Sequence, residues 1–512
     1  MPKSTMPQVK NIVFLMLENR SLDNLLGWLY ELPLRPATGK PAPPDRVYPE
    51  GSPRAFDGLK KGTFFNPSAN GTEVEVVPIP DGYNKAVPLR DPFEALKQLP
   101  VWWNGVMNQF FGGVGDIGRM PTPDSGPPPM KGFLQDYYSF VFPGLDPNPL
   151  FGLDILWTYQ PARAPVINSL AMQYAVSDRW HASVPSDTNP NRAYSLCGTS
   201  LGRESNLHLN AVETFDRPTI FHALANGGGK NWGLYYRDIW KENKCYTDYT
   251  FPGIAGAPNG EIAEFGAFQA HAAAGTLPAF SYLEPKWTSP GMGPSKLVTG
   301  TDYHPNAEIG QSEDFLRDVY NAVRSGPQWH ETLFIVTFDE HGGNFDHVAP
   351  GWNAQNPDGK IGENGFEFNL YGARVPTILI SPFVHPRTVF RPKDPGGLPF
   401  DHTSTIKTLL GWAGVDLNAV DFGKRMALAP TFDYILEDRA VNGGKTLDLP
   451  DQGTAPVVAD SAQALAAGLP SVAARSILEK NDTPDAIRNE IARYRRDPAR
   501  FEAGIANIPR GK

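Results

Sequence analysis

Two short apolar runs in the chain end abruptly in polar side chains. The first run covers residues 12–17 and the second covers residues 333–338. Continuous apolar runs of this length are typical of strands that are buried on both faces of a parallel sheet. Each run is followed at once by oxygen-bearing side chains, namely Glu18 and Asn19 after the first and Asp339 and Glu340 after the second. Ligands of an open α/β sheet bind beyond the carboxyl ends of its strands, so we expect these groups to converge on one place.

Strand and helix patterns alternate along the middle of the chain. Strand-like segments lie at residues 175–179, 232–236, 279–283 and 375–381, and helix-like segments lie at residues 21–30, 165–174, 313–325 and 401–412. A further helix is predicted to open at Pro190, because proline is favoured in the first turn of a helix. This alternation is typical of an α/β fold with a mostly parallel central sheet flanked by helices.

Two regions depart from the alternation. Residues 31–129 are crowded with proline and glycine and predict a long irregular insertion. An aromatic cluster inside it is either a local core or a wall of the substrate pocket, and its members are Trp102, Trp103, Phe110 and Phe111. The tail, residues 453–512, is alanine-rich and then charged, with Thr483 as a helix N-cap and Pro484 at the first helical position. We expect this tail to form a C-terminal helical appendage.

The composition is that of an ordinary globular protein. Of 512 residues, 41% are hydrophobic and 20% are charged, so the chain can bury a full core. The net charge of −9 contains no basic block, which predicts no nucleic-acid partner. The same acidity disfavours electrostatic docking to an anionic membrane and leaves zwitterionic or dispersed lipid substrates open. Cys197 and Cys245 are too few for a disulfide scaffold.

The hydropathy pattern shows no targeting or membrane segment. Residues 1–10 are polar, and the apolar run at residues 12–17 ends at a glutamate, which does not fit a signal peptide. No stretch approaches the roughly 18 consecutive apolar residues expected of a transmembrane helix. We therefore expect a soluble protein, either cytoplasmic or exported by another route, and leave its oligomeric state open.

The oxygen donors at the predicted strand ends form a candidate cation site. Its members are Glu18, Asn19, Asp339 and Glu340, with the Thr188 hydroxyl as a fifth donor. Such sets favour hard divalent cations such as calcium, magnesium or manganese, whereas zinc usually recruits histidine or cysteine and stays a less favoured choice. The alternative interpretation is that each carboxylate only caps a helix or pairs with an arginine.

The segment Thr188-Asn189-Pro190-Asn191-Arg192 adds a nucleophile to this site. Pro190 places the residues before it at a helix amino terminus, which presents N–H groups and a positive dipole to an anion. Thr188 is then expected to attack phosphorus in line and form a phosphothreonine intermediate; the alternative is a simple N-cap. Asn191 is a further candidate catalytic residue. Arg192 is expected either to bind phosphate or to buttress the loop through a buried ion pair.

Several histidines are candidates for proton transfer or substrate binding. His304 lies between two predicted elements and is a candidate general acid for the departing alcohol. His341 and His347 flank a glycine turn that lets the loop approach a ligand, with His347 as a second catalytic candidate and His341 as a substrate-binding one. His402 is also a substrate-binding candidate. A structural role is the alternative for each.

With these residues in hand, the chain resembles the phosphoesterase family that joins bacterial non-haemolytic phospholipases C, acid phosphatase A enzymes and plant non-specific phospholipases C, within the alkaline phosphatase superfamily. The match spans most of residues 8–440. Each motif is modest alone, but their order and number are specific. They are Glu18-Asn19-Arg20-Ser21, the Thr188 segment, Asp339-Glu340-His341-Gly342-Gly343, Asp346-His347-Val348, Gly372-Ala373-Arg374-Val375-Pro376 and Asp401-His402-Thr403-Ser404.

The resemblance implies an alkaline phosphatase-like sheet, a metal held by Glu18, Asn19, Asp339 and Glu340, and a nucleophile at Thr188. The sequence departs from the family pattern at Asn344, where an aromatic residue is usual. It also lacks a histidine before His181, whereas the family's acid phosphatases use an active-site histidine ahead of the nucleophile. That absence weakens the phosphatase interpretation and leaves the identity of the general acid open.

The leading functional hypothesis is metal-dependent hydrolysis of a glycerophospholipid to diacylglycerol and a phosphorylated head group, as by a phospholipase C. The first alternative is a broad-specificity acid phosphatase that acts on small phosphomonoesters. The second alternative, which the intact set of nucleophile and carboxylates disfavours, is a non-catalytic protein that binds a phosphorylated ligand.

Overall fold

A computed structural model of the chain describes residues 2–34, 43–68, 70–79, 102–112, 121–141, 153–206, 214–288, 300–305, 307–362, 364–443 and 446–450. The predicted helical tail at residues 453–512 lies outside these residues, and so do the side chains of Trp102 and Trp103. Among the helices that the structure describes, none combines the length and the apolar character needed to cross a lipid bilayer.

A nine-stranded sheet in the order β2-β13-β7-β12-β11-β1-β10-β8-β9 forms the centre of the molecule. Only β12 runs against its two neighbours, β11 and β7, and the other pairings in the sheet are parallel. The predicted α/β fold with a mostly parallel sheet is therefore confirmed. The strands are β1 (Asn11–Leu17), β2 (Arg46–Tyr48), β7 (Ala175–Ser177), β8 (Trp232–Tyr236), β9 (Gly260–Glu264), β10 (Phe280–Glu284), β11 (Thr332–Phe338), β12 (Thr377–Ile380) and β13 (Thr388–Phe390).

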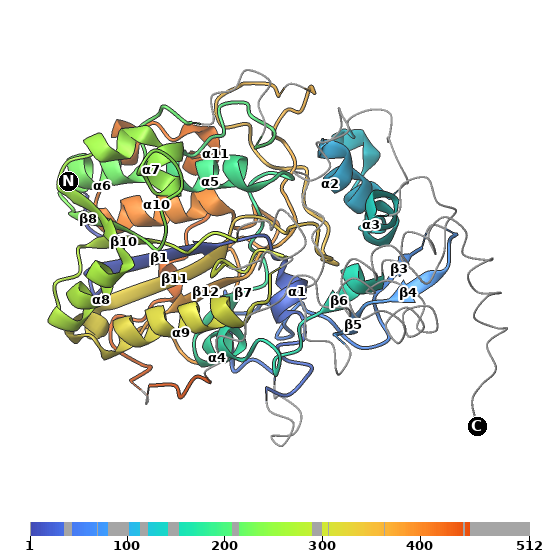
Figure 1. The fold of residues 1–512 in the computed structure, drawn as a ribbon, viewed down its shortest axis with the longest axis horizontal. Coiled ribbons are helices and arrows are strands. Elements are labelled where there is room, and N and C mark those ends of the chain that lie inside the picture. The colour runs from blue at the N-terminus through green and yellow to red at the C-terminus, as the bar shows by residue number, and fades with distance from the viewer. Residues whose placement is uncertain are drawn as a thin grey trace, which may run out of the picture.

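Helices cover both faces of this sheet. Figure 1 shows α5, α6 and α10 on one side and α4, α8 and α9 on the other. Apart from α2 and α3, the described α-helices are α1 (Leu22–Leu26), α4 (Pro165–Gln173), α5 (Thr188–Cys197), α6 (Ile220–Gly228), α7 (Tyr246–Thr250), α8 (Phe265–Ala274), α9 (Gly310–Ser325), α10 (His402–Ala413) and α11 (Gly423–Leu428). Short 3-10 turns are η3 (Pro123–Ser125), η4 (Leu153–Leu156), η5 (Pro252–Gly256), η6 (Pro327–Glu331), η7 (Leu417–Ala419) and η8 (Asp433–Ile435).

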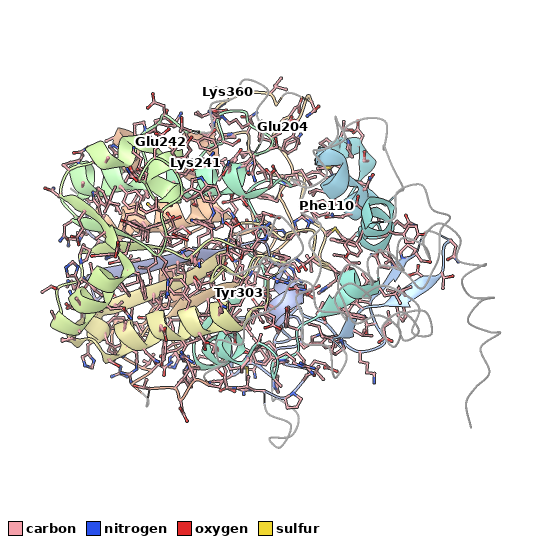
Figure 2. The ribbon with its side chains drawn as sticks, in the orientation of Figure 1. Phe110, Glu204, Lys241, Glu242, Tyr303 and Lys360 are labelled. Atoms are coloured by element: carbon pink, nitrogen blue, oxygen red, sulfur yellow. The ribbon has the colours of Figure 1, made fainter. Side chains whose placement is uncertain are left out.

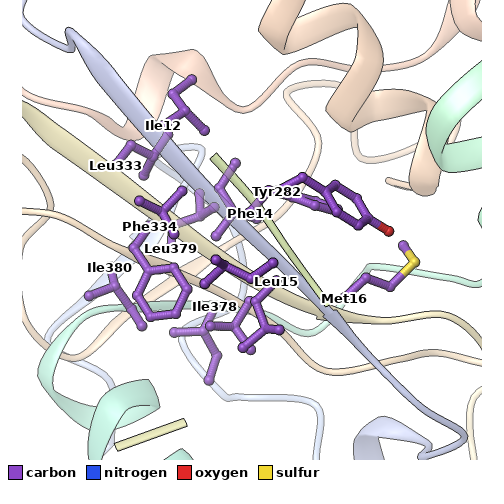
Figure 3. Packing of buried hydrophobic residues seen from close by; sticks show 14 of the residues in the cluster. Ile12, Phe14, Leu15, Met16, Tyr282, Leu333, Phe334, Ile378, Leu379 and Ile380 are labelled. Carbon is purple, nitrogen blue, oxygen red and sulfur yellow. The ribbon is translucent and has the colours of Figure 1, made fainter. Parts of the chain in front are cut away.

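The two central strands are buried along their whole length. Every residue of β1 and β11 is buried, which explains why both read as unbroken apolar runs. Figure 3 shows Leu15 of β1 and Phe334 of β11 beside Ile378 and Ile380 of β12, while Phe14 lies beside Tyr282 of β10. This packing fixes where the two strands end and therefore where the polar residues after them emerge.

The first helix is shorter than the sequence pattern predicts. A helix was expected over residues 21–30, but α1 ends at Leu26. Ser21 caps its start through a hydrogen bond from the Asn24 amide, as expected for a serine N-cap. At the other end, the Leu59 amide donates to the Gly27 carbonyl at 2.7 Å, and this bond takes an acceptor that a longer helix would need.

The region 31–129 is less irregular than expected. Its described parts contain β2, β3 (Phe65–Pro67), β4 (Glu73–Glu75), β5 (Val77–Pro78) and α2 (Trp102–Phe111). β2 joins the main sheet beside β13, while β5 pairs with β6 (Trp157–Thr158). A three-residue strand carries too little periodicity to be recognised in a proline-rich segment, because proline and glycine dominate the local pattern.

This region and α3 (Phe133–Val141) share a second hydrophobic core. Met107 and Phe110 on α2 pack with Phe133 on α3 and with Phe345, which follows β11. Phe110, labelled in Figure 2, is fully buried, so the described part of the aromatic cluster behaves as a local core rather than as a pocket wall. Figure 1 shows α2 and α3 beyond the ends of the strands, on the side where β1 leaves the sheet.

A buried glutamate ties two helices together beneath the sheet. Glu313 on α9 accepts the amide hydrogens of Val166 and Ile167 at the start of α4, at 2.5 and 3.1 Å. It also accepts the hydroxyl of Tyr303 at 2.6 Å. An acceptor in this place satisfies donors that a helix amino terminus otherwise leaves without partners.

Replacing this glutamate should therefore destabilise the fold. We expect Glu313→Ala to lower the free energy of unfolding by about 3 kcal/mol, because two buried amides and one buried hydroxyl lose their acceptor. Glu313→Gln keeps the volume and one acceptor atom and should cost about 1–2 kcal/mol. Urea unfolding followed by circular dichroism measures both values, and equal stability of Glu313→Ala and the wild type would contradict the proposed anchor.

Candidate active site

The parallel register of β1 and β11 sets the position of the site. Leu17 lies opposite Phe338, and the Asp339 amide donates to the Leu17 carbonyl at 3.1 Å. Glu18 and Asp339 consequently leave the sheet side by side, although 321 positions separate them in the sequence. The expected convergence of the two polar strand ends is therefore what the structure shows.

Arg192 on α5 joins the two carboxylates. Its Nε and Nη2 atoms donate to Glu18 Oε1 at 2.9 and 2.5 Å, and Nε lies 3.4 Å from Asp339 Oδ2. Nη2 also donates to the carbonyls of Met16 and Leu17. Arg192 is 1% exposed, so this geometry is that of a buried ion pair that buttresses the site.

Burial and mutual contact shift the pKa values of the charged groups in this cluster. Burial, with a further contribution from the nearby Asp339, raises the pKa of Glu18 well above its ordinary value, while Arg192 opposes the rise. Burial alone would lower the pKa of Arg192, but Glu18 and Asp339 outweigh it and raise that pKa. Glu340 adds a third carboxylate with no exposed surface. Two buried acidic groups, Glu18 and Asp339, are thus paired with one guanidinium.

The loops after β1 and β11 are locked together by backbone contacts. The Asn19 and Glu340 amides both donate to Asp339 Oδ1, at 2.9 and 2.7 Å. Asn19 has a positive φ of 54°, and Gly342 lies so close that a Cβ added there would be 2.3 Å from the Asn19 carbonyl oxygen. Asn344, the departure from the family pattern, donates through Nδ2 to the carbonyls of Asn19 and His341 at 3.1 and 2.9 Å. These bonds hold the Asn19 backbone and the Asp339 side chain in fixed relation.

Thr188 is the first residue of α5 and points at the acidic groups. Its Oγ1 donates to Glu18 Oε2 at 3.2 Å and lies 3.4 Å from Asn19 Oδ1. The helix begins two residues before Pro190, so Thr188 does occupy the expected helix amino terminus. This helix start offers an anion fewer backbone N–H groups than expected, because the Asn189 amide donates to Asn206 Oδ1 at 2.6 Å and Pro190 has no N–H.

Asn191 shapes the loop that precedes Thr188. Its Oδ1 accepts the Val184 amide at 3.1 Å, and its Nδ2 donates to the carbonyls of Val184, Ser186 and Asp187. The side chain is fully buried. In the structure the amide acts on the backbone that leads into Thr188, and a catalytic role for Asn191 stays a prediction.

The two histidines expected to be catalytic differ in their surroundings. Nδ1 of His347 lies 2.7 Å from Asp23 Oδ2 and Nε2 lies 3.2 Å from Asp57 Oδ1, so both ring nitrogens face carboxylates. Burial lowers its pKa, but Asp23 and Asp57 outweigh burial and raise the pKa to about 9. Nδ1 of His304 lies 2.9 Å from the Pro305 carbonyl, and a positive charge on His304 would lower the pKa of Glu18. His304 is thus the one of this pair with an electrostatic link to the acidic cluster.

The two histidines expected to bind substrate make contacts within the protein. His402 Nε2 lies 2.6 Å from the Asp339 carbonyl oxygen, and burial lowers its pKa. His341 Nε2 lies 2.8 Å from Gln109 Oε1, and Nδ1 lies 3.4 Å from Glu340 Oε2. Both rings are 0–1% exposed. In the structure they hold the chain that carries Asp339 and Glu340, and substrate contact by either remains a prediction.

A second acidic group adjoins the site, and an arginine side chain already pairs with it. Asp23, Asp346 and His347 lie close enough together to hold a metal ion. Arg374, however, donates to Asp23 Oδ1 and to Asp346 Oδ1, both at 3.0 Å, with no exposed surface on its side chain. Arg374 and His347, whose pKa is raised to about 9, supply two positive charges to the two carboxylates, so this group is best explained as a structural ion network.

The first acidic group is a candidate through the chemistry of its donors, but the carboxylate oxygens of Glu18, Asp339 and Glu340 do not all lie within 4.8 Å of one another, as the ligand atoms of Asp23, Asp346 and His347 do. Glu18, Asn19, Asp339 and Glu340 offer only oxygen donors, and Thr188 adds a hydroxyl beside them. Asp339 Oδ2 is buried and accepts no hydrogen bond from the residues that the structure describes. Buried carboxylates that outnumber their positive partners are stabilised by a hard cation, because the alternative is protonation.

Two aromatic side chains near the site were not identified from the sequence. The guanidinium of Arg192 lies 4.7 Å from the ring centre of Trp287 and 5.9 Å from that of Tyr246. Glu284, at the end of β10, accepts the Tyr246 amide and the Trp287 indole, both at 2.8 Å. Neither aromatic carries a local signal, because Arg192, which both rings face, is distant in sequence.

Comparisons with known proteins agree with this geometry. The family model described as the Phosphoesterase family matches residues 9–415. Non-specific phospholipase C4 from Arabidopsis thaliana is 31% identical over 453 residues, covering 84% of this chain and 72% of that protein. Non-specific phospholipase C1 from the same plant is 32% identical over 446 residues, again with 84% and 72% covered. A solved protein of the alkaline phosphatase superfamily from Vibrio parahaemolyticus aligns with a TM-score of 0.31 and 15% identity, covering 52% of this chain and 64% of that one.

The resemblance inferred from the motifs is confirmed by the family match, which includes both strand ends and the Thr188 segment. Because the matched region contains the whole acidic cluster, the comparison and the geometry concern the same part of the molecule. The chain is a phosphoric ester hydrolase, and it belongs to the Phosphoesterase family.

Proposed function

We propose that this protein is a cation-dependent phospholipase C that cleaves glycerophospholipids through a phosphothreonine intermediate. The observation that carries the proposal is the position of the Thr188 hydroxyl, 3.2 Å from Glu18, which forms a buried ion pair with Arg192 beside Asp339. Both Arabidopsis relatives are named non-specific phospholipases C, and this chain spans 72% of each. The same cluster suits any phosphoester, so the substrate class is taken from the relatives.

The chain's own residues provide the nucleophile and its surroundings. Thr188 Oγ1 attacks phosphorus, its proton passes towards Glu18 Oε2, and the bond from phosphorus to the diacylglycerol oxygen breaks. Arg192 keeps Glu18 in place and Asn191 keeps the loop before Thr188 in place. Water then attacks the phosphothreonine, restores the Thr188 hydroxyl and releases the phosphorylated head group.

A divalent cation held by Glu18, Asn19, Asp339 and Glu340 would lower the pKa of the Thr188 hydroxyl and neutralise negative charge on the phosphate oxygens. Calcium, magnesium and manganese suit these oxygen donors, and zinc stays a less favoured choice.

His304 is the best placed of the candidate general acids. A carbonyl accepts but cannot donate, so the contact with the Pro305 carbonyl assigns a proton to Nδ1 and leaves Nε2 as the atom that exchanges one. His347 has both nitrogens against carboxylates, and His402 is fully buried against the Asp339 carbonyl. We assign protonation of the departing diacylglycerol oxygen to His304.

Substrate choice tests the proposal directly. Hydrolysis of dispersed phosphatidylcholine and of a small aryl phosphate should be compared at several pH values under the same cation concentration. We expect the diester lipid to have the higher kcat/KM, with diacylglycerol and phosphocholine as products. A large preference for the monoester would favour the acid phosphatase alternative instead.

Removal of the nucleophile should abolish turnover without unfolding the protein. Thr188→Ala is expected to reduce kcat by about four orders of magnitude, because no side-chain oxygen remains to form the covalent intermediate. Thr188→Ser keeps the hydroxyl and should retain measurable activity. Steady-state kinetics with circular dichroism as the folding check measures both, and wild-type rates in Thr188→Ala would refute the assigned role.

Chelation should remove activity reversibly. After dialysis against EDTA, we expect the protein to lose most of its hydrolase activity and to regain it when calcium, magnesium or manganese is added back. Elemental analysis should find bound metal in the wild type and less of it in Asp339→Asn, which removes one charged donor. Full activity in a preparation shown to be metal-free would contradict cation dependence.

The close approach at Gly342 provides a matched pair of variants. Gly342→Ala should push the loop after β11 away from Asn19 and reduce kcat/KM by about 100-fold, since a displacement of about 1 Å is enough for such a loss. Gly359→Ala has a similar positive φ, 78° against 61°, but nothing within 4 Å of the added methyl group. It should cost stability without a comparable loss of activity. Equal activity losses in the two variants would show that backbone strain, and not the contact with Asn19, is responsible.

A further inference from the structure

The loop that follows β8 leaves the sheet on the side of the active site. β8 pairs in parallel with β10, and β10 pairs in parallel with β1, so the three strands end at the same edge of the sheet. Tyr236, the last residue of β8, lies opposite Glu284, the last residue of β10. Residues 237–243, which come next, are all exposed. We refer to residues 237–244 as the β8 loop.

The β8 loop presents two neighbouring apolar side chains to solvent. Ile239 is 46% exposed and Trp240 is 44% exposed. Five large hydrophobic side chains are exposed in the part of the chain that the structure describes, and the other three stand apart from one another in the sequence, at Ile361, Leu417 and Leu428. Single exposed apolar residues are common on proteins, whereas contiguous apolar surface is a mark of an interaction site. Ile239 and Trp240 therefore form an exposed apolar pair that needs an explanation.

Backbone hydrogen bonds fix the loop in this exposed position. The Lys244 amide donates to the Lys241 carbonyl at 2.8 Å, and the Trp240 amide donates to the Lys244 carbonyl at 2.8 Å. Glu242 and Asn243 both have positive φ, 52° and 57°, as in the two-residue turn of a tight β-hairpin. Figure 2 labels Lys241 and Glu242 of this turn, near α7. The turn thus holds the apolar pair away from the core.

Aromatic contacts connect the pair to the start of α5. The ring centre of Trp240 lies 5.5 Å from that of Tyr246 and 6.4 Å from that of Trp287, and it meets both rings edge-on. The Tyr246 hydroxyl donates to Asn189 Oδ1, and Asn189 directly follows Thr188. One row of packed side chains therefore runs from exposed apolar surface to the residue beside the proposed nucleophile.

The charges of the β8 loop suit a zwitterionic surface. Three basic side chains stand against two acidic ones, so the loop is almost neutral although the whole chain carries −9; they are Arg237, Lys241 and Lys244 against Asp238 and Glu242. A head group with one positive and one negative charge can pair with both signs. An anionic surface would repel the chain as a whole, and no block of basic residues in the loop offsets that repulsion.

The apolar residues of the loop suit a lipid surface in particular. Tryptophan is enriched where a bilayer meets water, because its ring is apolar and its N–H keeps a polar partner. A lipid with two acyl chains leaves its bilayer at a large cost in free energy, since every CH2 group of the chains passes into water. An enzyme that cleaves such a lipid avoids this cost when its site is held at the bilayer surface.

We propose that Ile239 and Trp240 insert into the surface of a zwitterionic phospholipid bilayer and hold the Thr188 site against it. The inference rests on the proposed function, in which the substrate is a glycerophospholipid. The exposed pair takes no part in breaking or forming bonds. A lipid that is dissolved as single molecules should therefore not need it.

The test separates surface binding from chemistry through the physical state of the substrate. Sedimentation of the full chain with phosphatidylcholine vesicles gives the affinity for the surface. Hydrolysis of the same vesicles is compared with hydrolysis of dihexanoyl phosphatidylcholine below its micelle-forming concentration, which presents no surface. The variants are Ile239→Ser, which leaves the aromatic rings unchanged, and the same substitution combined with Trp240→Ala.

Leu417→Ser is the matched control. Leu417 is 37% exposed and follows α10, whose Gly411 carbonyl accepts the Thr5 amide ahead of β1. It therefore lies at the end of the sheet opposite to the active site. Its replacement removes exposed apolar surface without changing the face that we assign to the bilayer.

Burying the exposed half of a side chain of this size strengthens binding by about threefold to tenfold. We expect vesicle affinity to fall by about this factor in Ile239→Ser and by about 10–100-fold in the double variant, with similar losses of kcat/KM on vesicles. Ile239→Ser should hydrolyse the single-molecule lipid at the wild-type rate, and Leu417→Ser should match the wild type throughout. If the double variant does not fold, Ile239→Ser carries the test alone.

Four results would overturn the proposal. The first is wild-type vesicle affinity in every folded variant of the loop, and the second is an equal loss on vesicles and on the single-molecule lipid in Ile239→Ser, which would place that residue in the site itself. The third is tighter binding to phosphatidylglycerol vesicles than to phosphatidylcholine vesicles. The fourth is a wild-type dimer in sedimentation velocity without lipid that the loop variants lack, which would assign the pair to a second copy of the chain.

Failure of the proposed function is recognised separately. A wild type that binds phosphatidylcholine vesicles through the β8 loop but hydrolyses neither form of the lipid would refute the phospholipase assignment and leave the surface contact supported. A wild type that hydrolyses both forms while its loop variants keep full vesicle affinity would leave the assignment intact and refute the surface contact.

Discussion

The whole site depends on two strands that pair in parallel and stop at the same level. Backbone hydrogen bonding between β1 and β11 delivers Glu18 and Asp339 to one point, where neither can reach water. Buried like charges repel strongly, and such a pair persists only if positive charge is supplied close by. Arg192 supplies part of it from α5 and, because it lies one helical turn after Thr188, the same ion pair also fixes the position of Thr188.

Around this centre the protein uses separate networks to hold each loop. Arg374 ties Asp23 to Asp346 and so links the start of α1 to the loop after β11. Glu284 holds the aromatic pair over Arg192 from the end of β10. Their common effect is preorganisation, in which hydrogen bonds and ion pairs within the protein hold the loops around Glu18 and Asp339 in place.

The sequence allowed the strand ends and the nucleophile segment to be found, because both are local patterns. An apolar run followed by Glu18 or Asp339 is visible in one window, and Pro190 marks a helix start. The roles of Asn191 and His347 could not be found in this way. The Asn191 side chain accepts a hydrogen bond from the backbone of its own loop. His347 Nε2 contacts Asp57, which lies 290 positions earlier in a proline-rich region. Such contacts depend on tertiary packing, which periodicity does not encode. The same limit applies to β2, whose partner β13 is distant in sequence.

The antiparallel strand β12 is reached by a connection unlike the others in the sheet. Because β12 runs against β11, the long connection between them starts and finishes at the same end of the strands and needs no helix to return across the sheet. Its first residues carry Asp339, Glu340 and Asp346 and are buried, so a change of length is tolerated best in its more exposed part, residues 351–361. Such a change would leave Glu18 and Asp339, whose positions the paired strand ends set, where they are.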